Sequence, residues 1–366
     1  MAKRIIISGG GTGGHIFPAI AIANALKSLD AKTEILFVGA NGRMEMEKVP
    51  AAGYKIIGLD IQGFRRDGLL KNIFLPFKLI GSILKSLSII GEFKPDAVVG
   101  VGGYASGPLL FAASLKKIPY LLQEQNSYAG VTNKYLGKKA KKVCVAFDNM
   151  DSFFKADKII KTGNPVRVNA VDVEGKRAEA LAFFELDADK KTVLVVGGSL
   201  GALTLNNSVM AGIEAFQNAG VQVIWQTGKY YYKSIVERFG NRSKDCGIRI
   251  HEFLNRMDLA YAASDLIVSR AGAGTIAELC LVDKPVILVP SPNVAEDHQT
   301  KNANALFKQQ AAVLVSDKHA EVELVEQAIK VLNDDTLCAT LANNIKKLGF
   351  AHADKVIAEE VIKIAL

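Results

Sequence analysis

A run of glycines that ends in a histidine stands near the start of the sequence, where it could bind phosphate. Residues 9–14 read GGGTGG, and His15 follows directly. The run separates the apolar residues 5–7 from a stretch with helical spacing, so we predict a strand, a tight loop and a helix. Glycines let backbone N–H groups approach a ligand closely, and the start of a helix favours an anion. The pattern therefore predicts a phosphate or diphosphate site.

His15 is a candidate general base. The dipole at a helix N-terminus opposes a second proton on the imidazole, which favours the neutral ring that a base needs at pH 7. A histidine that only caps the helix or packs against the loop fits the same position. Both interpretations stay open at this point.

The spacing of Gly9, Gly11 and Gly14 also matches the dinucleotide-binding fingerprint. Such a site needs a carboxylate after the second strand to bind the ribose. The predicted second strand, 34–38, is followed by Gly-Ala-Asn, and its counterpart in the second half ends in Gln226 and Thr227. NAD is therefore excluded, and no cofactor is predicted.

A second set of polar residues lies within residues 265–290. We predict a strand there, followed by the loop 270–274 and then a helix that opens at Thr275. The loop amides could bind phosphate, and Glu278 could accept the hydroxyls of a ribose. Thr275-x-x-Glu278 is equally a capping box. Polar residues at 297–303 open another helix and could contact a base or a sugar, or be solvated.

No metal site is predicted, because Asp187-Ala188-Asp189 precedes a strand in a polar turn instead of following one. Residues 162–165, Thr-Gly-Asn-Pro, form a candidate hinge. Arg167 follows it and would be either a cation between two domains or half of a surface ion pair.

The elements that position these residues alternate between strands and helices, which indicates parallel sheets covered by helices. A chain of 366 residues is long enough for two domains, and the strand–glycine–helix unit at 4–14 recurs at 192–201. We therefore predict an α/β protein with two Rossmann-like domains. The predicted strands are residues 4–8, 34–38, 97–100, 120–123, 142–145, 192–196, 221–226, 266–269 and 286–289.

The amino-acid composition limits the classes of partner that the protein is expected to bind. The net charge of +8 and the pI near 9.1 favour an anionic partner. Aromatic residues are few and are not interleaved with basic stretches, so nucleic acid is the weakest candidate. The four cysteines lack paired spacing, which predicts buried free thiols in a reducing cytoplasm. Only three isoleucines follow Lys3 and Arg4, too few for a signal h-region, so we expect a cytoplasmic protein.

Residues 64–90 favour a membrane surface. Lys71, Lys78 and Lys85 recur every seven residues among Leu, Ile and Phe. Lysines and Pro76 interrupt any apolar run long enough to span a bilayer, so we predict an interfacial amphipathic element with its lysines at anionic lipid phosphates. A core helix with three solvated lysines is the alternative.

Taken together, these residues resemble the MurG family of lipid-linked peptidoglycan glycosyltransferases over nearly the whole chain. The resemblance implies the GT-B architecture, two Rossmann-like domains facing across a cleft, with a last helix that crosses back to the first domain. It places residues 1–163 with 346–366 in an acceptor and membrane-docking domain and 164–345 in a UDP-sugar domain. The matching motifs are GGTGGHIFPA at 10–19, GGYASGP at 102–108, EQNSYAGVTN at 124–133, GNPVR at 163–167, GGSLGA at 197–202, RAGAGTIAE at 270–278 and DHQTKNA at 297–303.

The resemblance also implies a reaction. The enzyme would transfer N-acetylglucosamine from UDP-N-acetylglucosamine to undecaprenyl-diphosphate-linked muramoyl-pentapeptide, with inversion, as a peripheral protein at the cytoplasmic face of the membrane beside other cell-wall assembly proteins. His15 would be the base, and Glu278 would bind the ribose and Gln299 the donor sugar. The other implied substrate-binding residues are Thr12, Gly13, Gly14, Tyr104, Asn126, Arg167, Ser199, Leu254, Ala273, Gly274 and Thr275.

Other readings remain open. A related transferase could glycosylate diacylglycerol, which carries no diphosphate for residues 10–15 to bind. A UDP-sugar epimerase would need acidic residues, for which Glu124 is the obvious N-terminal candidate, and Glu124 could also replace His15 as the base. A membrane-bound UDP-sugar sensor would explain the donor motifs but not the histidine.

Overall fold

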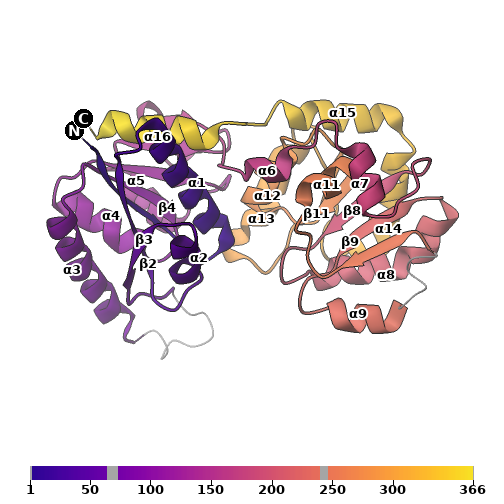
Figure 1. Ribbon diagram of the computed structural model, residues 1–366, viewed down its shortest axis with the longest axis horizontal. Coiled ribbons are helices and arrows are strands. Elements are labelled where there is room, and N and C mark those ends of the chain that lie inside the picture. The colour runs from indigo at the N-terminus through magenta and orange to yellow at the C-terminus, as the bar shows by residue number, and fades with distance from the viewer. Residues whose placement is uncertain (1, 64–72, 240–245, 366) are drawn as a thin grey trace. The chain divides into compact units, whose positions relative to one another are not determined.

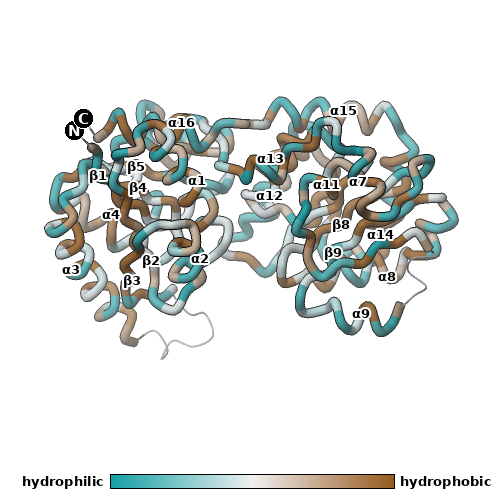
Figure 2. Tube along the Cα trace, in the orientation of Figure 1, coloured by the Kyte–Doolittle hydropathy of each residue, from teal (hydrophilic) through white to brown (hydrophobic). Residues whose placement is uncertain are grey.

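The computed structural model describes residues 2–63, 73–239 and 246–365, which form two compact units (Figure 1). Met1–Val166 and Ala351–Leu366 belong to the first unit, and Arg167–Phe350 forms the second. The described part of each unit contains one parallel sheet with helices on both faces. Figure 2 shows that hydrophobic strands occupy the interior of each unit. This arrangement confirms the predicted pair of Rossmann-like domains.

The first unit has the strand order β3-β2-β1-β4-β5-β6-β7 within the described residues. Its sheet is buried on both faces because neighbouring residues of β1 point into different cores: Ile5 and Ile7 pack under α1 and α16, while Ile6 packs under α3 and α4. The strands are β1 Arg4–Gly9, β2 Glu34–Ala40, β3 Lys55–Leu59, β4 Ala97–Gly102, β5 Tyr120–Glu124, β6 Lys142–Val145 and β7 Ile159–Lys161. The helices are α1 Gly13–Leu29, α2 Glu45–Ala51, α3 Leu75–Phe93, α4 Ser106–Leu115, α5 Val131–Gly137 and α16 Ala353–Ile364.

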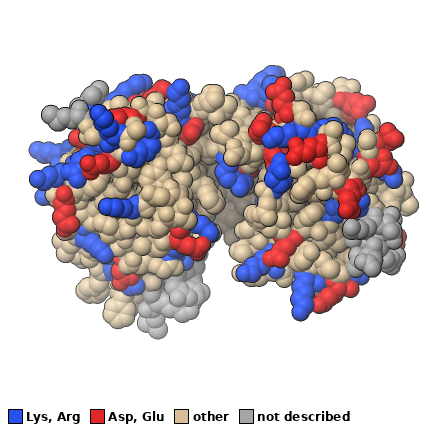
Figure 3. Space-filling model, in the orientation of Figure 1, with Lys and Arg blue, Asp and Glu red and all other residues tan. Residues whose placement is uncertain are grey.

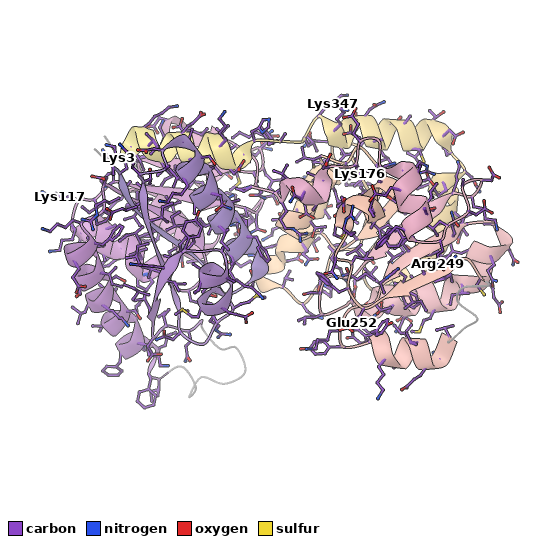
Figure 4. The ribbon with its side chains drawn as sticks, viewed as in Figure 1. Lys3, Lys117, Lys176, Arg249, Glu252 and Lys347 are labelled. Atoms are coloured by element: carbon purple, nitrogen blue, oxygen red, sulfur yellow. The ribbon has the colours of Figure 1, made fainter. Side chains whose placement is uncertain are left out.

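The last helix completes the first unit. Ile357 and Val361 of α16 are fully buried against α1, and Lys3 Nζ donates to the Ala365 carbonyl oxygen at 2.8 Å. Figure 1 shows α16 beside α1, and Figure 4 shows Lys3 near the C-terminal end of the chain. The expectation that the C-terminal helix returns to the first domain is therefore confirmed.

The second unit has the strand order β10-β9-β8-β11-β12-β13 within the described residues. Helices α8 and α14 cover one face over a core that includes Val195 and Trp225. The strands are β8 Thr192–Val196, β9 Gln222–Gln226, β10 Ile248–His251, β11 Leu266–Ser269, β12 Val286–Leu288 and β13 Val313–Leu314. The helices are α6 Val168–Val171, α7 Arg177–Phe183, α8 Leu203–Asn218, α9 Tyr232–Phe239, α11 Met257–Ala263, α12 Ala273–Leu279, α13 His298–Phe307, α14 Ala320–Leu332 and α15 Asp335–Lys346.

The segment predicted to be a hinge is anchored in the first unit. Thr162 and Asn164 are buried, and the Asn164 side chain accepts from Gln123 Nε2 at 2.7 Å and donates to the Gln125 carbonyl oxygen at 3.0 Å. The chain therefore enters the second unit at Arg167, where the hydrogen-bonded segment ends.

The cysteines are free, as predicted, but only two of them are buried. Burial raises the pKa of the Cys144 and Cys280 thiols to about 12, so both stay protonated. Cys246 and Cys338 are half-buried.

Candidate active site

The predicted site residues gather at the carboxyl ends of strands. In each sheet the first strand of the unit lies beside the fourth, β1 beside β4 and β8 beside β11, and the chain leaves these pairs in opposite directions. Such a switch point opens a crevice for ligands at the carboxyl edge of a parallel sheet. Thr12 lies in the loop after β1 and Gly13–His15 in the first turn of α1, while Tyr104 lies in the loop after β4. In the second unit Ser199 lies in the loop after β8, and Ala273–Glu278 lie in helix α12, which follows β11.

The glycines of the first loop are required by close backbone approach. Gly11 has φ 82° and Gly103 has φ 92°, a region that side chains disfavour. A Cβ on Gly103 would lie 2.4 Å from the Gly10 carbonyl oxygen, and one on Gly102 would lie 2.6 Å from the His15 ring. The two glycine loops are therefore packed directly on each other, with the His15 ring on Gly102.

Not every amide of this loop is available to a ligand. Gly10 N donates to the Gly102 carbonyl oxygen at 3.2 Å, and Gly11 N donates to Glu45 Oε2 at 2.8 Å. Glu45, which the sequence analysis missed, is 1% exposed, and its Oε1 accepts from Ala40 N at 3.0 Å. The amides of residues 12–14, at the first turn of α1, have no acceptor within the described part of the chain. The amides of this loop that are left for a ligand are those of Thr12, Gly13 and Gly14.

The hydrogen bonds of His15 decide which ring nitrogen can act as a base. Nδ1 lies 3.1 Å from the Gly10 carbonyl oxygen and 3.2 Å from Thr12 Oγ1. A carbonyl oxygen only accepts, so Nδ1 carries the proton and donates it. In the neutral ring Nε2 is then the nitrogen with the lone pair, as a general base requires.

Tyr104 stands beside the same loop. Its ring packs on Gly63, where a Cβ would come within 2.2 Å of a ring carbon, and its side chain is still 45% exposed. The guanidinium of Arg43, an exposed cation from the loop after β2, lies 5.7 Å from the Tyr104 ring centroid. The sequence analysis did not single out Arg43, because one arginine in a polar loop carries no spacing signal.

Glu124 holds the Asn126 loop in place. It is 3% exposed, and its Oε1 accepts from Asn126 N at 3.1 Å. Its Oε2 accepts from Gly130 N at 3.2 Å and from Asn133 Nδ2 at 2.8 Å. A buried carboxylate with both oxygens occupied by its own loop is poorly placed to take a proton from a substrate. The geometry thus favours His15 over Glu124 as the base.

In the second unit the structure separates the two interpretations of Glu278. Helix α12 begins at Ala273, with Gly272 as its N-cap, so Thr275 lies inside the helix and the predicted capping box is wrong. Glu278 Oε1 instead accepts from Arg167 Nε at 3.1 Å and forms an ion pair with its terminal nitrogen at 3.0 Å. Arg167 therefore forms an ion pair within the second unit, which is one of the two interpretations that the sequence left open. Glu278 lies in the second turn of α12 because the helix starts two residues earlier than predicted.

Gln299 joins the loops after β11 and β12. Its Oε1 accepts from Ala271 N at 3.2 Å and from Ser291 N at 2.8 Å. Nε2 is therefore the atom of Gln299 that can donate to a ligand. The first turn of α12 is open at Gly274, where a Cβ would meet no atom within 4 Å, so a ligand can approach the backbone of Gly274 and Thr275.

Two further predicted site residues, Ser199 and Leu254, differ in the groups that they expose to a ligand. Ser199 is exposed in the glycine loop after β8, and its carbonyl oxygen accepts from Lys229 N at 3.1 Å. Leu254 follows β10 and is only 4% exposed, and its backbone N donates to Gln226 Oε1 at 3.1 Å. A ligand contact at Leu254 would therefore involve the backbone.

The predicted amphipathic element differs from the observed one. Lys71 lies outside the described residues, and Pro76 is in the first turn of α3. Lys78 pairs with Asp60 at 3.2 Å, and Lys85 Nζ donates to the Gly58 carbonyl oxygen at 2.8 Å. The prominent exposed side chains are apolar, and we call this set the α3 surface: Ile73, Phe74, Phe77, Ile80 and Leu84.

A groove of about 500 Å³ adjoins the α3 surface and is lined by Phe74, Phe77, Lys78 and Lys85 among others. Basic side chains gather at the upper outer edge of the first unit on the face seen in Figure 3, with acidic side chains among them. In the described part of the chain, no helix is both long and apolar enough to cross a membrane.

Comparison with protein families decides the class. Residues 5–145 match the glycosyltransferase family 28 N-terminal domain, and residues 192–361 match the family 28 C-terminal domain. The chain belongs to glycosyltransferase family 28. The two matches cover most of the two Rossmann-like units and include the segments that follow β1, β4, β8 and β11.

Relatives within family 28 align over nearly their whole length. A protein of Parabacteroides distasonis is 56% identical over 361 residues, which is 99% of this chain and 98% of the relative. One of Flavobacterium psychrophilum is 50% identical over 99% of this chain and 97% of its own. Both are named UDP-N-acetylglucosamine–N-acetylmuramyl-(pentapeptide) pyrophosphoryl-undecaprenol N-acetylglucosamine transferase.

Solved structures share the fold of this chain. Acinetobacter baumannii MurG superposes with a TM-score of 0.80 at 28% identity, over 99% of both chains. A UDP-N-acetylglucosamine 2-epimerase superposes with a TM-score of 0.66 at 15% identity, over 99% of this chain and 96% of the epimerase. The epimerase likeness shows a shared fold and no more.

Proposed function

We propose that this chain transfers N-acetylglucosamine from UDP-N-acetylglucosamine to undecaprenyl-diphosphate-linked N-acetylmuramoyl-pentapeptide, forming a β-1,4 bond with inversion. The observation that carries the proposal is the end-to-end match to relatives named for this reaction, at 56% identity in one of them. The chemistry of the site supports it, because both glycine loops and the helices that carry His15 and Glu278 follow the carboxyl ends of strands.

The proposed reaction is a single displacement. His15 Nε2 accepts the proton of the acceptor 4-hydroxyl while that oxygen attacks C1 of the donor sugar, and the bond from C1 to the UDP oxygen breaks. Thr12, Gly13 and Gly14 bind the acceptor diphosphate through their amides. Tyr104 shapes the acceptor pocket.

The donor occupies the second unit in this proposal. Ala273, Gly274 and Thr275 face the UDP diphosphate, Glu278 accepts a ribose hydroxyl, and Gln299 Nε2 donates to the sugar. Hydrogen bonds to a charged diphosphate contribute about 1.5–3 kcal/mol each, enough for a few amides to stabilise the leaving group substantially. The remaining donor-site positions are Asn126, Arg167, Ser199 and Leu254.

Peripheral attachment to the cytoplasmic face of the membrane is part of the proposal, since the acceptor is lipid-linked. The α3 surface would enter the interface while basic side chains attract anionic headgroups. Phe77, Ile80 and Leu84 recur at helical spacing on α3, and the exposed Ile73 and Phe74 directly precede the helix.

A label-transfer assay tests the function. Purified protein is incubated with labelled UDP-N-acetylglucosamine and a short-chain muramoyl-pentapeptide lipid, with diacylglycerol and no acceptor in parallel. We expect label only on the muramoyl lipid. Label on diacylglycerol, or UDP release that is independent of acceptor, would overturn the assigned acceptor.

A further inference from the structure

Glu278 is held at both of its oxygens, and the second contact comes from a residue that no motif contains. Tyr261 of α11 donates from its hydroxyl to Glu278 Oε2 at 3.2 Å, while Arg167 occupies Oε1. The Glu278 side chain is 12% exposed, so it is not fully enclosed by these two partners.

The geometry points to Tyr261 as the positioning residue that fixes the Glu278 carboxylate for recognition of a ribose hydroxyl. The inference rests on the proposed function, because it assigns Tyr261 to the nucleotide site of the donor. Tyr261 acts through Glu278 and is not itself a catalytic residue.

The hydrogen bonds of Arg167 and Tyr261 leave few acceptor positions on the Glu278 carboxylate. Each carboxylate oxygen accepts about two hydrogen bonds. Two nitrogens of Arg167 fill Oε1, and the Tyr261 hydroxyl takes one position on Oε2. One acceptor position on Oε2 is left for a ribose hydroxyl, and Tyr261 sets its direction.

The side chain alone cannot supply this orientation. The last torsion of a glutamate is broad and has no sharp rotamer, so the plane of the Glu278 carboxylate is set by its hydrogen-bond partners. Tyr261 is a rigid partner, because it is 2% exposed within α11. Burial, followed by the neighbouring Glu278 charge, raises the Tyr261 pKa well above its ordinary value, so the hydroxyl stays a donor at neutral pH.

The test compares binding of UDP and of 2′,3′-dideoxy-UDP by calorimetry, in the wild type and in Y261F. We expect the wild type to bind UDP more tightly than the dideoxy nucleotide. In Y261F the ratio of the two dissociation constants should fall about tenfold, with little change in the affinity for the dideoxy nucleotide. A general structural defect would weaken both nucleotides alike. In the Glu278→Ala background Y261F should have no further effect on the preference.

Y120F is the matched control. Tyr120 is also 2% exposed, and its hydroxyl donates to the Leu136 carbonyl oxygen at 2.7 Å in the first unit. We expect Y120F to keep the wild-type preference. If Y261F does not fold, 3-fluorotyrosine in place of Tyr261 tests the same bond, because its more acidic hydroxyl should raise the preference, and an unchanged preference would overturn the assignment.

The possible results distinguish the proposed function, ribose recognition by Glu278 and the role of Tyr261. A wild type that does not bind UDP would overturn the proposed function and this assignment with it. A wild type that binds both nucleotides equally would overturn ribose recognition by Glu278. A wild type that discriminates, together with a Y261F that discriminates to the same extent, would overturn the role of Tyr261 alone.

Discussion

The α3 surface should govern membrane binding through its phenylalanines. Phe74 is 67% exposed and Phe77 is 72% exposed. Full burial of such a side chain contributes about 1.5–3 kcal/mol, so transfer of the exposed two-thirds contributes about 1–2 kcal/mol for each. Replacing both with serine should therefore weaken membrane partitioning by about 2–4 kcal/mol, or about 30-fold or more.

The assay is co-sedimentation with phosphatidylcholine vesicles that contain or lack phosphatidylglycerol. Phe307→Ser is the matched control, because Phe307 is 52% exposed on α13 of the second unit. We expect wild type and F307S to bind alike and the double variant F74S/F77S to bind weakly, with unchanged turnover of a short-chain acceptor. Equal binding by the double variant, or an equal loss in F307S, would refute the reasoning.

Three further predictions concern the first loop, the base and stability in acid. H15Q should lower kcat by about 10²–10⁴-fold, and by at least about tenfold more than Glu124→Gln does. Steady-state kinetics in which Glu124→Gln lowers kcat more than H15Q would contradict the assignment of His15 as the base. Glu45→Gln keeps only one acceptor oxygen for the amides of Gly11 and Ala40, which loosens the link between the glycine loop and β2. The KM for the lipid acceptor should therefore rise about tenfold while the donor KM stays within about twofold, and an equal rise in both would count against the acceptor-site role. The hydrogen bond and ion pair with Arg256 lower the pKa of Asp258, so its stabilisation is present above the ordinary carboxyl pKa and is lost as pH falls towards the lowered value. Urea unfolding should show a steeper loss of stability below about pH 4 in wild type than in Asp258→Asn, and parallel curves would contradict this.

The strands that sequence patterns missed are the edge strands of both sheets. Lys55–Leu59 and Ile159–Lys161 flank the first sheet, and Ile248–His251 and Val313–Leu314 flank the second. Interior strands are buried on both faces and read as continuous apolar runs. An edge strand is short, is paired on one side only and mixes polar with apolar residues, so its pattern is weak until a neighbour pairs with it.

Local sequence determined the two units, their glycine loops and the positions of His15 and Glu278, because strand–glycine–helix units are encoded within a few consecutive residues. Only tertiary structure decided how the carboxylates act. Glu45 meets Gly11 across 34 positions, and Arg167 meets Glu278 across 111. Glu124, a candidate base by its residue type, proved to hold a loop because burial surrounded it with donors. The role of a charged side chain depends on which donors the fold brings to it, and no local pattern records those donors.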